Sequence, residues 1–192
     1  MNLETAIVTR RSERRLTDPA PGDDEFAEML RMAAMAPDHG LLRPWRWILV
    51  RDRARLVLGE SFAAEATSER PELLAAKALR APLLATLVFR PQRQHRVPEW
   101  EQMAATCGMS HTLMLLLHSR GYGSIWRTGA FTAFPRVRDV LGLRLDEQLL
   151  GWLYVGTPLT VGGERPRLPE DMSDRLSTLE VDEASRVGIA GL

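Results

Sequence analysis

The sequence predicts one α+β domain followed by an extended tail, and three observations support this prediction. The chain has 192 residues, which fits a single domain of the usual ~50–250 residues. Segments with the helical period of apolar residues alternate with short runs of β-favouring residues. Residues 98–119 form the longest predicted helix, which is apolar nearly all round and is therefore expected in the middle of the fold.

The first half of the chain predicts two helices and a strand. The first helix covers residues 2–11, and turn-forming residues at 18–23 separate it from the second helix. Pro37 ends the second helix, because the residue before a proline is pushed out of helical geometry. A loop at 38–44 then leads to a strand at 45–50. The second helix carries an i, i+3, i+4, i+7 stripe made of Phe26, Met29, Leu30 and Ala33.

The second half predicts a central strand with several flanking elements. Residues 83–89 are apolar on both faces, as expected of a strand that is covered on both sides. The segment that begins at Thr160 has no compact amphipathic pattern and is expected to be an extended arm. The remaining predicted elements are helices at 53–67, 71–80 and 133–141, and strands at 124–127 and 149–155.

Charge and cysteine content exclude several classes of protein. The 25 basic and 25 acidic side chains cancel, so bulk charge favours neither a nucleic-acid partner nor a membrane surface. The single cysteine, Cys107, excludes an internal disulfide framework and is expected to be a packed, unreactive thiol. No secretory signal is visible, and the longest apolar run, 113–117, is too short to span a bilayer. These features predict a cytoplasmic protein.

Familiar catalytic and metal-binding motifs are absent from the sequence. It contains no HExxH, paired CxxC, P-loop or G-x-S-x-G pattern, so no metal site is expected. Residues 121–126 begin like a dinucleotide-binding fingerprint but lack its third glycine. The histidines His95, His111 and His118 have no metal-ligand spacing and are expected to be structural or exposed.

Arginines instead gather at two distant places in the chain. Residues 10–15 read Arg-Arg-Ser-Glu-Arg-Arg at the end of the first predicted helix, and Arg165 and Arg167 lie in the tail. Either group could be an ordinary solvated surface. A serine hydroxyl beside forked guanidinium donors also suits the geometry of a phosphate group. From the residues alone, both interpretations stay open.

A set of short motifs, spread in order over residues 10–169, gives these arginines a context. The first is Arg10-Arg11-Ser12-Glu13-Arg14, which follows the pattern R-R-S-x-R at a helix end. The others are Ala36-Pro37-Asp38-His39, Pro44-Trp45-Arg46-Trp47, Pro98-Glu99-Trp100-Glu101-Gln102, residues 123–130 and 154–158, and Arg165-Pro166-Arg167-Leu168-Pro169. Each motif is weak alone, but together the chain resembles the nitroreductase family of FMN-dependent oxidoreductases, most closely its compact bacterial branch.

The resemblance implies a fold, an assembly and an activity. The fold would be an α+β, nitroreductase-like three-layer sandwich, with a central mixed, mainly antiparallel sheet flanked by helices. Residues 1–170 would form the FMN-binding domain, while the tail at 171–192 has no counterpart. The protein would be an intertwined homodimer with FMN at the interface. It would pass hydride from NADH or NADPH through flavin N5 to a nitroaromatic, quinone or similar acceptor, without nucleic-acid or membrane partners.

The resemblance also assigns cofactor-binding residues. The FMN phosphate would be held by Arg10, Ser12, Arg165 and Arg167, with Arg11 along the same edge. Arg14 would face the N1/O2 edge of the flavin ring, where positive charge stabilises the anionic reduced form. His39 would contact the cofactor or roof its pocket. The ring would be flanked, from the other chain, by Trp126, Arg127 and Thr128. No catalytic side chain is expected, because the flavin carries the chemistry.

Some alternatives remain open at this stage. Trp126 could simply pack in the core, and His39 could cap its loop. Leu41 and Arg43 stand where many family members have Asn and Gln, and Met35 stands where close relatives tend to be basic. Leu41 and Arg43 put the usual amide contacts to the flavin and the shape of the substrate pocket in doubt, and Met35 removes a ribityl or phosphate contact. The divergent loop at 39–43 favours the main alternative, a non-catalytic FMN- or nucleotide-binding protein.

Overall fold

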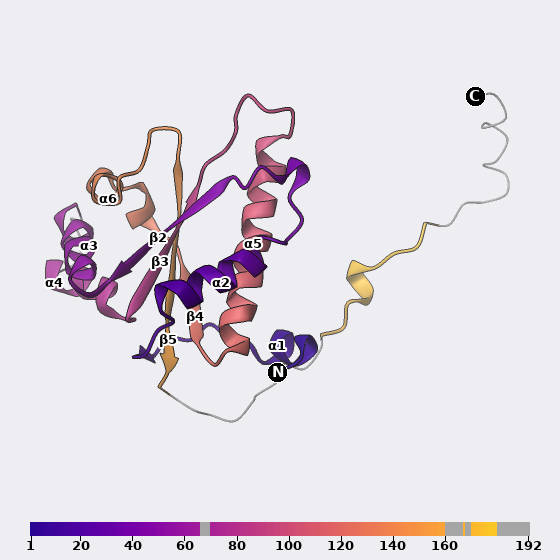
Figure 1. Ribbon diagram of the computed structural model, residues 1–192, viewed down its shortest axis with the longest axis horizontal. Helices are drawn as coiled ribbons and strands as arrows, with labels where there is room; N and C mark the ends of the chain where they lie inside the picture. Colours follow the sequence, from indigo (N-terminus) through magenta and orange to yellow (C-terminus); the bar gives the residue numbers. More distant parts are fainter. Residues whose placement is uncertain (66–69, 160–166, 168–169, 180–192) are drawn as a thin grey trace.

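The computed structural model describes residues 1–65, 70–159, 167 and 170–179, and it shows a three-layer α/β/α arrangement (Figure 1). A sheet occupies the middle layer, and helices cover both of its faces. Two buried clusters of apolar side chains, one on each face of the sheet, form the core. The predicted α+β sandwich is therefore confirmed.

The sheet is built from antiparallel ladders. Its strand order is β1-β5-β3-β2, and β4 also pairs with β5. The predicted central strand is confirmed as β3 (Leu83–Phe89), in which every residue is buried. The other strands are β1 (Leu16–Thr17), β2 (Trp45–Arg51), β4 (Gly123–Arg127) and β5 (Gln148–Pro158). Strand β1 was not predicted, because two residues are too few to show an alternating pattern.

One face of the sheet is covered by α3 (Asp52–Ala64), α4 (Pro71–Ala75) and α6 (Pro135–Val140), drawn on the left of Figure 1. The 3-10 helices η2 (Ala76–Leu79) and η3 (Ala130–Ala133) also belong to this side. Helix α4 is shorter than predicted, because the chain tightens into η2 before it reaches β3.

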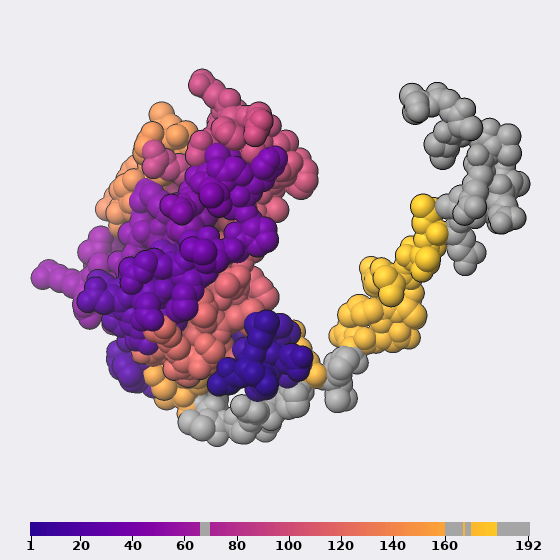
Figure 2. All heavy atoms as spheres, turned by 45° about the vertical axis from the view of Figure 1, so that its right-hand side comes forward, coloured from indigo at the N-terminus to yellow at the C-terminus, as the bar shows by residue number. Residues whose placement is uncertain are grey.

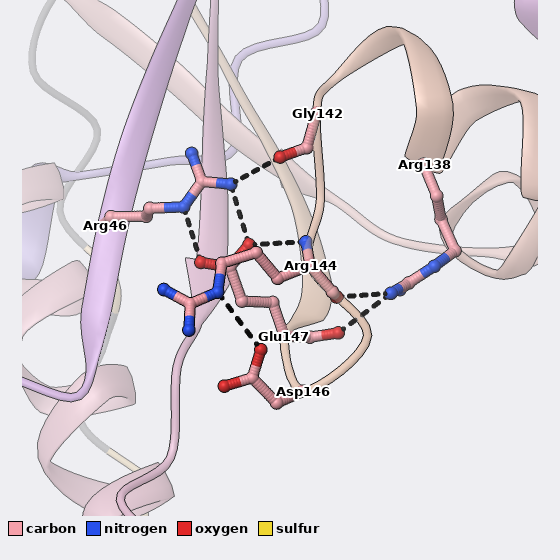
Figure 3. A network of polar contacts seen from close by, with 6 residues as sticks. All are labelled: Arg46, Arg138, Gly142, Arg144, Asp146 and Glu147. Atoms are coloured by element: carbon pink, nitrogen blue, oxygen red, sulfur yellow. Dashed lines mark hydrogen bonds and ion pairs between the residues drawn. The ribbon is translucent and has the colours of Figure 1, made fainter.

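An ion pair between Arg46 and the buried carboxylate of Glu147 holds the connection between α6 and β5 against β2 (Figure 3). The Arg46 guanidinium donates to both carboxylate oxygens of Glu147, at 2.7 and 2.8 Å, and the Arg144 N–H donates to the same carboxylate at 2.9 Å. Arg138 donates to the carbonyl oxygens of Arg144 and Glu147. The pairing with Arg46 lowers the pKa of Glu147 to about 2. Charge-assisted hydrogen bonds therefore hold the segment between α6 and β5 in place.

The opposite face is covered by α2 (Asp23–Ala33) and α5 (Glu99–Ser119), while α1 (Leu3–Thr9) lies beside the C-terminal end of α5. Met109, Leu113 and Leu117 of α5 pack against the sheet. On its outer side Trp100 is 70% exposed, and Cys107, which was expected to be packed, is exposed as well. The prediction that this helix lies in the middle of the fold is therefore wrong for a single chain, because no described element covers its outer side.

Beyond the body, the described residues 170–179 form an exposed arm that runs away from the domain (Figure 2). It contains one short 3-10 helix, η4 (Ser173–Arg175). This part agrees with the predicted extended tail, whereas the rest of the predicted tail lies outside the described residues. Among the helices of the described residues, none combines the length and the hydropathy that a membrane-spanning segment needs.

Candidate functional site

Three arginines meet at the end of helix α1. Arg10 and Arg11 follow its last residue, and the backbone N–H of Arg167 donates to the carbonyl oxygen of Val8 at 2.9 Å. The Val8 carbonyl also accepts from Nη1 of Arg11, at 2.9 Å. Two segments that are about 150 positions apart in the sequence thus bring guanidinium groups together.

The surroundings of Arg10 favour the binding of an anion. Burial lowers the pKa of Arg10, and the neighbouring charges of Arg167 and Arg11 lower it further. Its Nη1 atom is buried and has no hydrogen-bond acceptor among the described residues. Buried polar groups are nearly always hydrogen-bonded, and like charges repel one another. A bound anion such as a phosphate would resolve both costs.

Ser12 connects this arginine cluster to the sheet. It forms an isolated parallel bridge with Ser124 of β4, and the N–H of Glu13 donates to the Ser124 carbonyl oxygen at 3.1 Å. The Ser12 and Arg14 side chains are exposed on this surface. The bridge therefore places the R-R-S-x-R segment next to the first residues of β4.

A cleft of about 480 Å³ begins at the residue after Ser124. It lies between the β4–β5 pair on one side and η2 and η3 on the other. Four aromatic and three basic side chains contribute to its walls, and no described residue that lines it is acidic. The lining residues are Lys77, Arg80, Ile125, Trp126, Arg127, Thr128, Phe131, Trp152 and Tyr154. Its size and its aromatic side chains suit a planar organic ligand.

Two buried donors in the cleft walls have no acceptor among the described residues. They are Nε of Arg127 and Nε1 of Trp152, two residues that are paired in the β4–β5 ladder. The Arg127 guanidinium carbon lies 5.6 Å from the centre of the Tyr154 ring, and Lys77 Nζ lies 5.0 Å from that of Phe131. The cleft therefore offers aromatic surface together with positive charge.

The predicted ring-flanking residues all line this cleft. Trp126, Arg127 and Thr128 come from the end of β4 and the turn after it. Within one chain, the Ser12–Ser124 bridge sets the segment that carries Arg10 beside the start of the same strand; their approach to a ring bound by the other chain stays a prediction. The Trp126 indole N–H donates to the Leu150 carbonyl oxygen at 3.0 Å, so this side chain also has the packing role that was left open.

Sequence reasoning named three of the nine residues that line the cleft. Lys77, Arg80 and Tyr154 were not predicted as site residues, and they come from η2, the residue after it and β5. The one available signal was composition, because Lys77 is the only lysine in a chain otherwise rich in arginine. Only the tertiary structure shows that these residues lie opposite β4.

His39 lies far from the arginine cluster within one chain. Its Nδ1 is 2.8 Å from Oε2 of Glu101, in the first turn of α5. At the other end of α5, the Thr9 hydroxyl lies 2.8 Å from Nε2 of His118. The rise of 1.5 Å per residue separates these two anchor points along α5 by about 25 Å. Arg165, the remaining predicted residue, lies outside the described residues.

Comparison with known proteins identifies relatives of this chain. Residues 7–157 match the sequence family described as "Nitroreductase family". The chain is 37% identical over 164 residues to "Putative NAD(P)H nitroreductase YdjA" of Escherichia coli strain K12, covering 82% of this chain and 89% of that protein.

Two solved structures share the fold. A nitroreductase-like family protein from Bacillus cereus superposes with a TM-score of 0.81 at 25% identity, covering 94% of this chain and 97% of that one. The "FMN and NADPH-dependent nitroreductase NfnB" from Sphigopyxis sp. strain HMH superposes with a TM-score of 0.67 at 20% identity, covering 95% and 100%. With the sequence match over most of its length and the same three-layer fold, the chain belongs to the nitroreductase family.

Proposed function

We propose that the protein is an FMN-dependent oxidoreductase that transfers electrons from NADH or NADPH to a nitroaromatic, quinone or similar electron-poor compound. One observation carries this proposal: a cluster of arginines, with a buried donor that has no acceptor among the described residues, is joined by the Ser12–Ser124 bridge to the strand that lines an aromatic cleft with no described acidic residue in its walls. The names of the relatives, an NAD(P)H nitroreductase and an FMN- and NADPH-dependent nitroreductase, support the same chemistry.

In this proposal the arginine cluster holds the FMN phosphate. Arg10 and Arg167 supply charge-assisted donors, Arg11 lines the same edge, and the Ser12 hydroxyl completes the phosphate contacts. We assign the same role to Arg165. The phosphate neutralises part of the mutual repulsion of the arginines, so the site favours a doubly charged phosphate monoester over a neutral ligand.

The flavin ring occupies the cleft, with Trp126, Arg127 and Thr128 on one side and Lys77 on the other. When bound, the flavin supplies the hydride chemistry, and the chain supplies position, electrostatics and exclusion of water. We assign Arg14 to the N1/O2 edge of the ring, where its charge stabilises the reduced form. One open face of the ring suffices for the nicotinamide and then the acceptor to stack in turn.

A homodimer completes the site. In one chain His39 and the arginine cluster lie at opposite ends of α5, too far apart to meet across a single flavin ring. If two copies pack with their α5 helices antiparallel, the His39 end of one chain approaches the cofactor of the other. The exposed outer side of α5, which includes Trp100 and Cys107, is the surface available for this contact. We also propose a cytoplasmic location, since a single cysteine suits a reducing compartment.

The proposal is tested by purification and anaerobic reduction. The protein should purify yellow, or become yellow with added FMN, and NADH or NADPH should bleach the 450 nm band. An acceptor such as a nitroaromatic should restore the band. A protein that binds FMN tightly but is not bleached by either dinucleotide would instead be the non-catalytic FMN-binding alternative. A protein that binds no FMN would refute the proposal.

A further inference from the structure

The cleft holds more positive charge than binding an uncharged ring requires. Lys77, Arg80 and Arg127 all line it, and none of the described lining residues is acidic. Arg80 and Arg127 both act on the Tyr154 hydroxyl, where their charges lower its pKa against the larger effect of burial, which raises it. Both charges therefore act on the Tyr154 side of the cleft, and the Arg127 guanidinium carbon lies 5.6 Å from the centre of the Tyr154 ring.

The backbone of Arg127 is held in place by its neighbours on β5. Its backbone pairs with Trp152 in the β4–β5 ladder, and its carbonyl oxygen abuts the bare Cα of Gly151, where any side chain would overlap it. The guanidinium group lies over the Tyr154 ring, and its Nε is buried without an acceptor among the described residues. Arg127 is only partly exposed, and a charge that is partly withdrawn from water acts more strongly on its neighbours than a fully exposed one.

A flavin ring gains negative charge when it takes up two electrons and one proton. We infer that the positive charge of Arg127, assisted by that of Arg80, stabilises this reduced, anionic ring. The two charges thereby raise the two-electron reduction potential of the bound flavin. The inference rests on the proposed function, because it needs the ring in this cleft. It adds a role that the binding of oxidised FMN alone would not require.

Four variants distinguish the effect of the positive charge in the cleft from the effect of side-chain size. Arg127→Gln keeps a long polar side chain and removes the charge, whereas Arg127→Lys keeps the charge. Arg80→Gln removes the second guanidinium, and Arg53→Gln removes an exposed arginine of α3 that does not line the cleft. The potential of the FMN-loaded protein is measured by dye-equilibrated reductive titration, and affinity for sulfite, which adds to flavin N5 and leaves a negative charge on the ring, is a second readout.

Arg127→Gln should lower the equilibrium constant for two-electron reduction at least tenfold, which corresponds to a drop of about 30 mV, and should weaken sulfite binding in parallel. Arg127→Lys should recover part of both losses. Arg80→Gln should shift the potential in the same direction but less, because Arg80 is exposed and screened by water and salt. Arg53→Gln should leave both readouts at their wild-type values.

An Arg127→Gln protein with wild-type potential and sulfite affinity would overturn the inference. If that variant does not retain FMN, the reduction potential and sulfite affinity of Arg127→Lys and Arg80→Gln are used for the test instead. An Arg80→Gln protein that matches Arg53→Gln in both readouts would then overturn it. Failure of the proposed function looks different, since the wild-type protein would bind no FMN or would not be bleached by NAD(P)H.

Discussion

Arg10 is the residue whose surroundings point most directly to a ligand. Its side chain is partly buried, its Nη1 has no acceptor among the described residues, and its closest charged neighbours are also arginines. This arrangement destabilises the ligand-free protein, because desolvation of the Arg10 charge and repulsion between the arginines both oppose it. The site therefore lowers the folding stability of the ligand-free protein, as is common at functional sites.

The first prediction follows from this site. Changing Arg10 and Ser12 together to Ala should abolish copurification of FMN, because each charge-assisted phosphate contact contributes about 1.5–3 kcal/mol. The far-UV circular dichroism should stay unchanged, since both residues lie beyond the last turn of α1. FMN content is measured from the absorbance ratio at 450 and 280 nm. A double variant with full flavin occupancy would show that the phosphate is held elsewhere.

A second prediction concerns Glu147, which is buried against Arg46. The pKa of Glu147 is lowered to about 2, below its ordinary value of 4.5, so its ion pair stabilises the fold fully above about pH 5. This contribution is lost as the pH falls from about 4.5 to about 2. Glu147→Gln should cost about 2 kcal/mol at pH 7, less than a fully buried pair, because Arg46 is one-third exposed.

Urea unfolding at a series of pH values checks this prediction. The difference between wild type and Glu147→Gln should shrink steadily below pH 4.5. Asp146→Asn is the matched control, because its pair with Arg144 is exposed and long, at 3.4 Å, and should contribute little. A stability gap that does not change between pH 7 and pH 3 would argue that Glu147 acts through packing alone.

At the scale of elements, the β4–β5 pair positions the cleft. Gly151 of β5 has a φ of +111°, which side-chain-bearing residues rarely adopt, and a Cβ at this position would overlap the carbonyl oxygen of Arg127. The close approach of the two strands therefore requires glycine. It sets the distance between Arg127 on β4 and Trp152 on β5.

The third prediction is that Gly151→Ala destabilises the fold by about 2–4 kcal/mol, from backbone strain and overpacking together. FMN occupancy should fall as well, because β4 must move away from β5 and carries one wall of the cleft with it. Thermal unfolding and flavin content are the measurements. Gly22→Ala is the comparison, since a Cβ there meets no atom within 4 Å and its φ is −64°. Equal effects of the two changes would contradict the strand-spacing argument.

At the scale of the whole molecule, α5 is the largest element with an uncovered side. Its 21 residues pack on the sheet along one side, while Trp100, Cys107 and His111 remain exposed in a single chain. A long helix that is apolar nearly all round is not stable with one side in water, so a second copy of the chain is the expected cover. This is the physical basis for the proposed homodimer.

The fourth prediction uses Cys107 as a reporter for this interface. The native protein should sediment as a dimer at micromolar concentration, with a buried interface above about 2,000 Å², and Cys107 should react with a thiol reagent only after unfolding. Changing Gly108 to Arg, at an exposed position where nothing lies within 4 Å in one chain, should weaken the dimer and make Cys107 reactive. A folded, flavin-loaded monomer would refute both the interface and the two-chain site.

Much of the architecture could be predicted from the sequence, because local patterns carry it. The period of Phe26, Met29 and Ala33 identified α2, and the continuous apolar run at 83–89 identified β3 as the central strand. Order along the chain also sufficed to place the R-R-S-x-R motif at the end of a helix and to recognise the family. These features depend on neighbours in the sequence.

The tertiary structure alone decided which distant residues share a site. It brings Arg167 against α1, sets Lys77 and Arg80 opposite Arg127, and separates His39 from Arg10 by the length of α5. It also shows that α5 has an uncovered side, contrary to the sequence prediction. The physical reason is that charge and burial act through space, so a cleft assembled from η2, β4 and β5 leaves no periodic signal in any one segment.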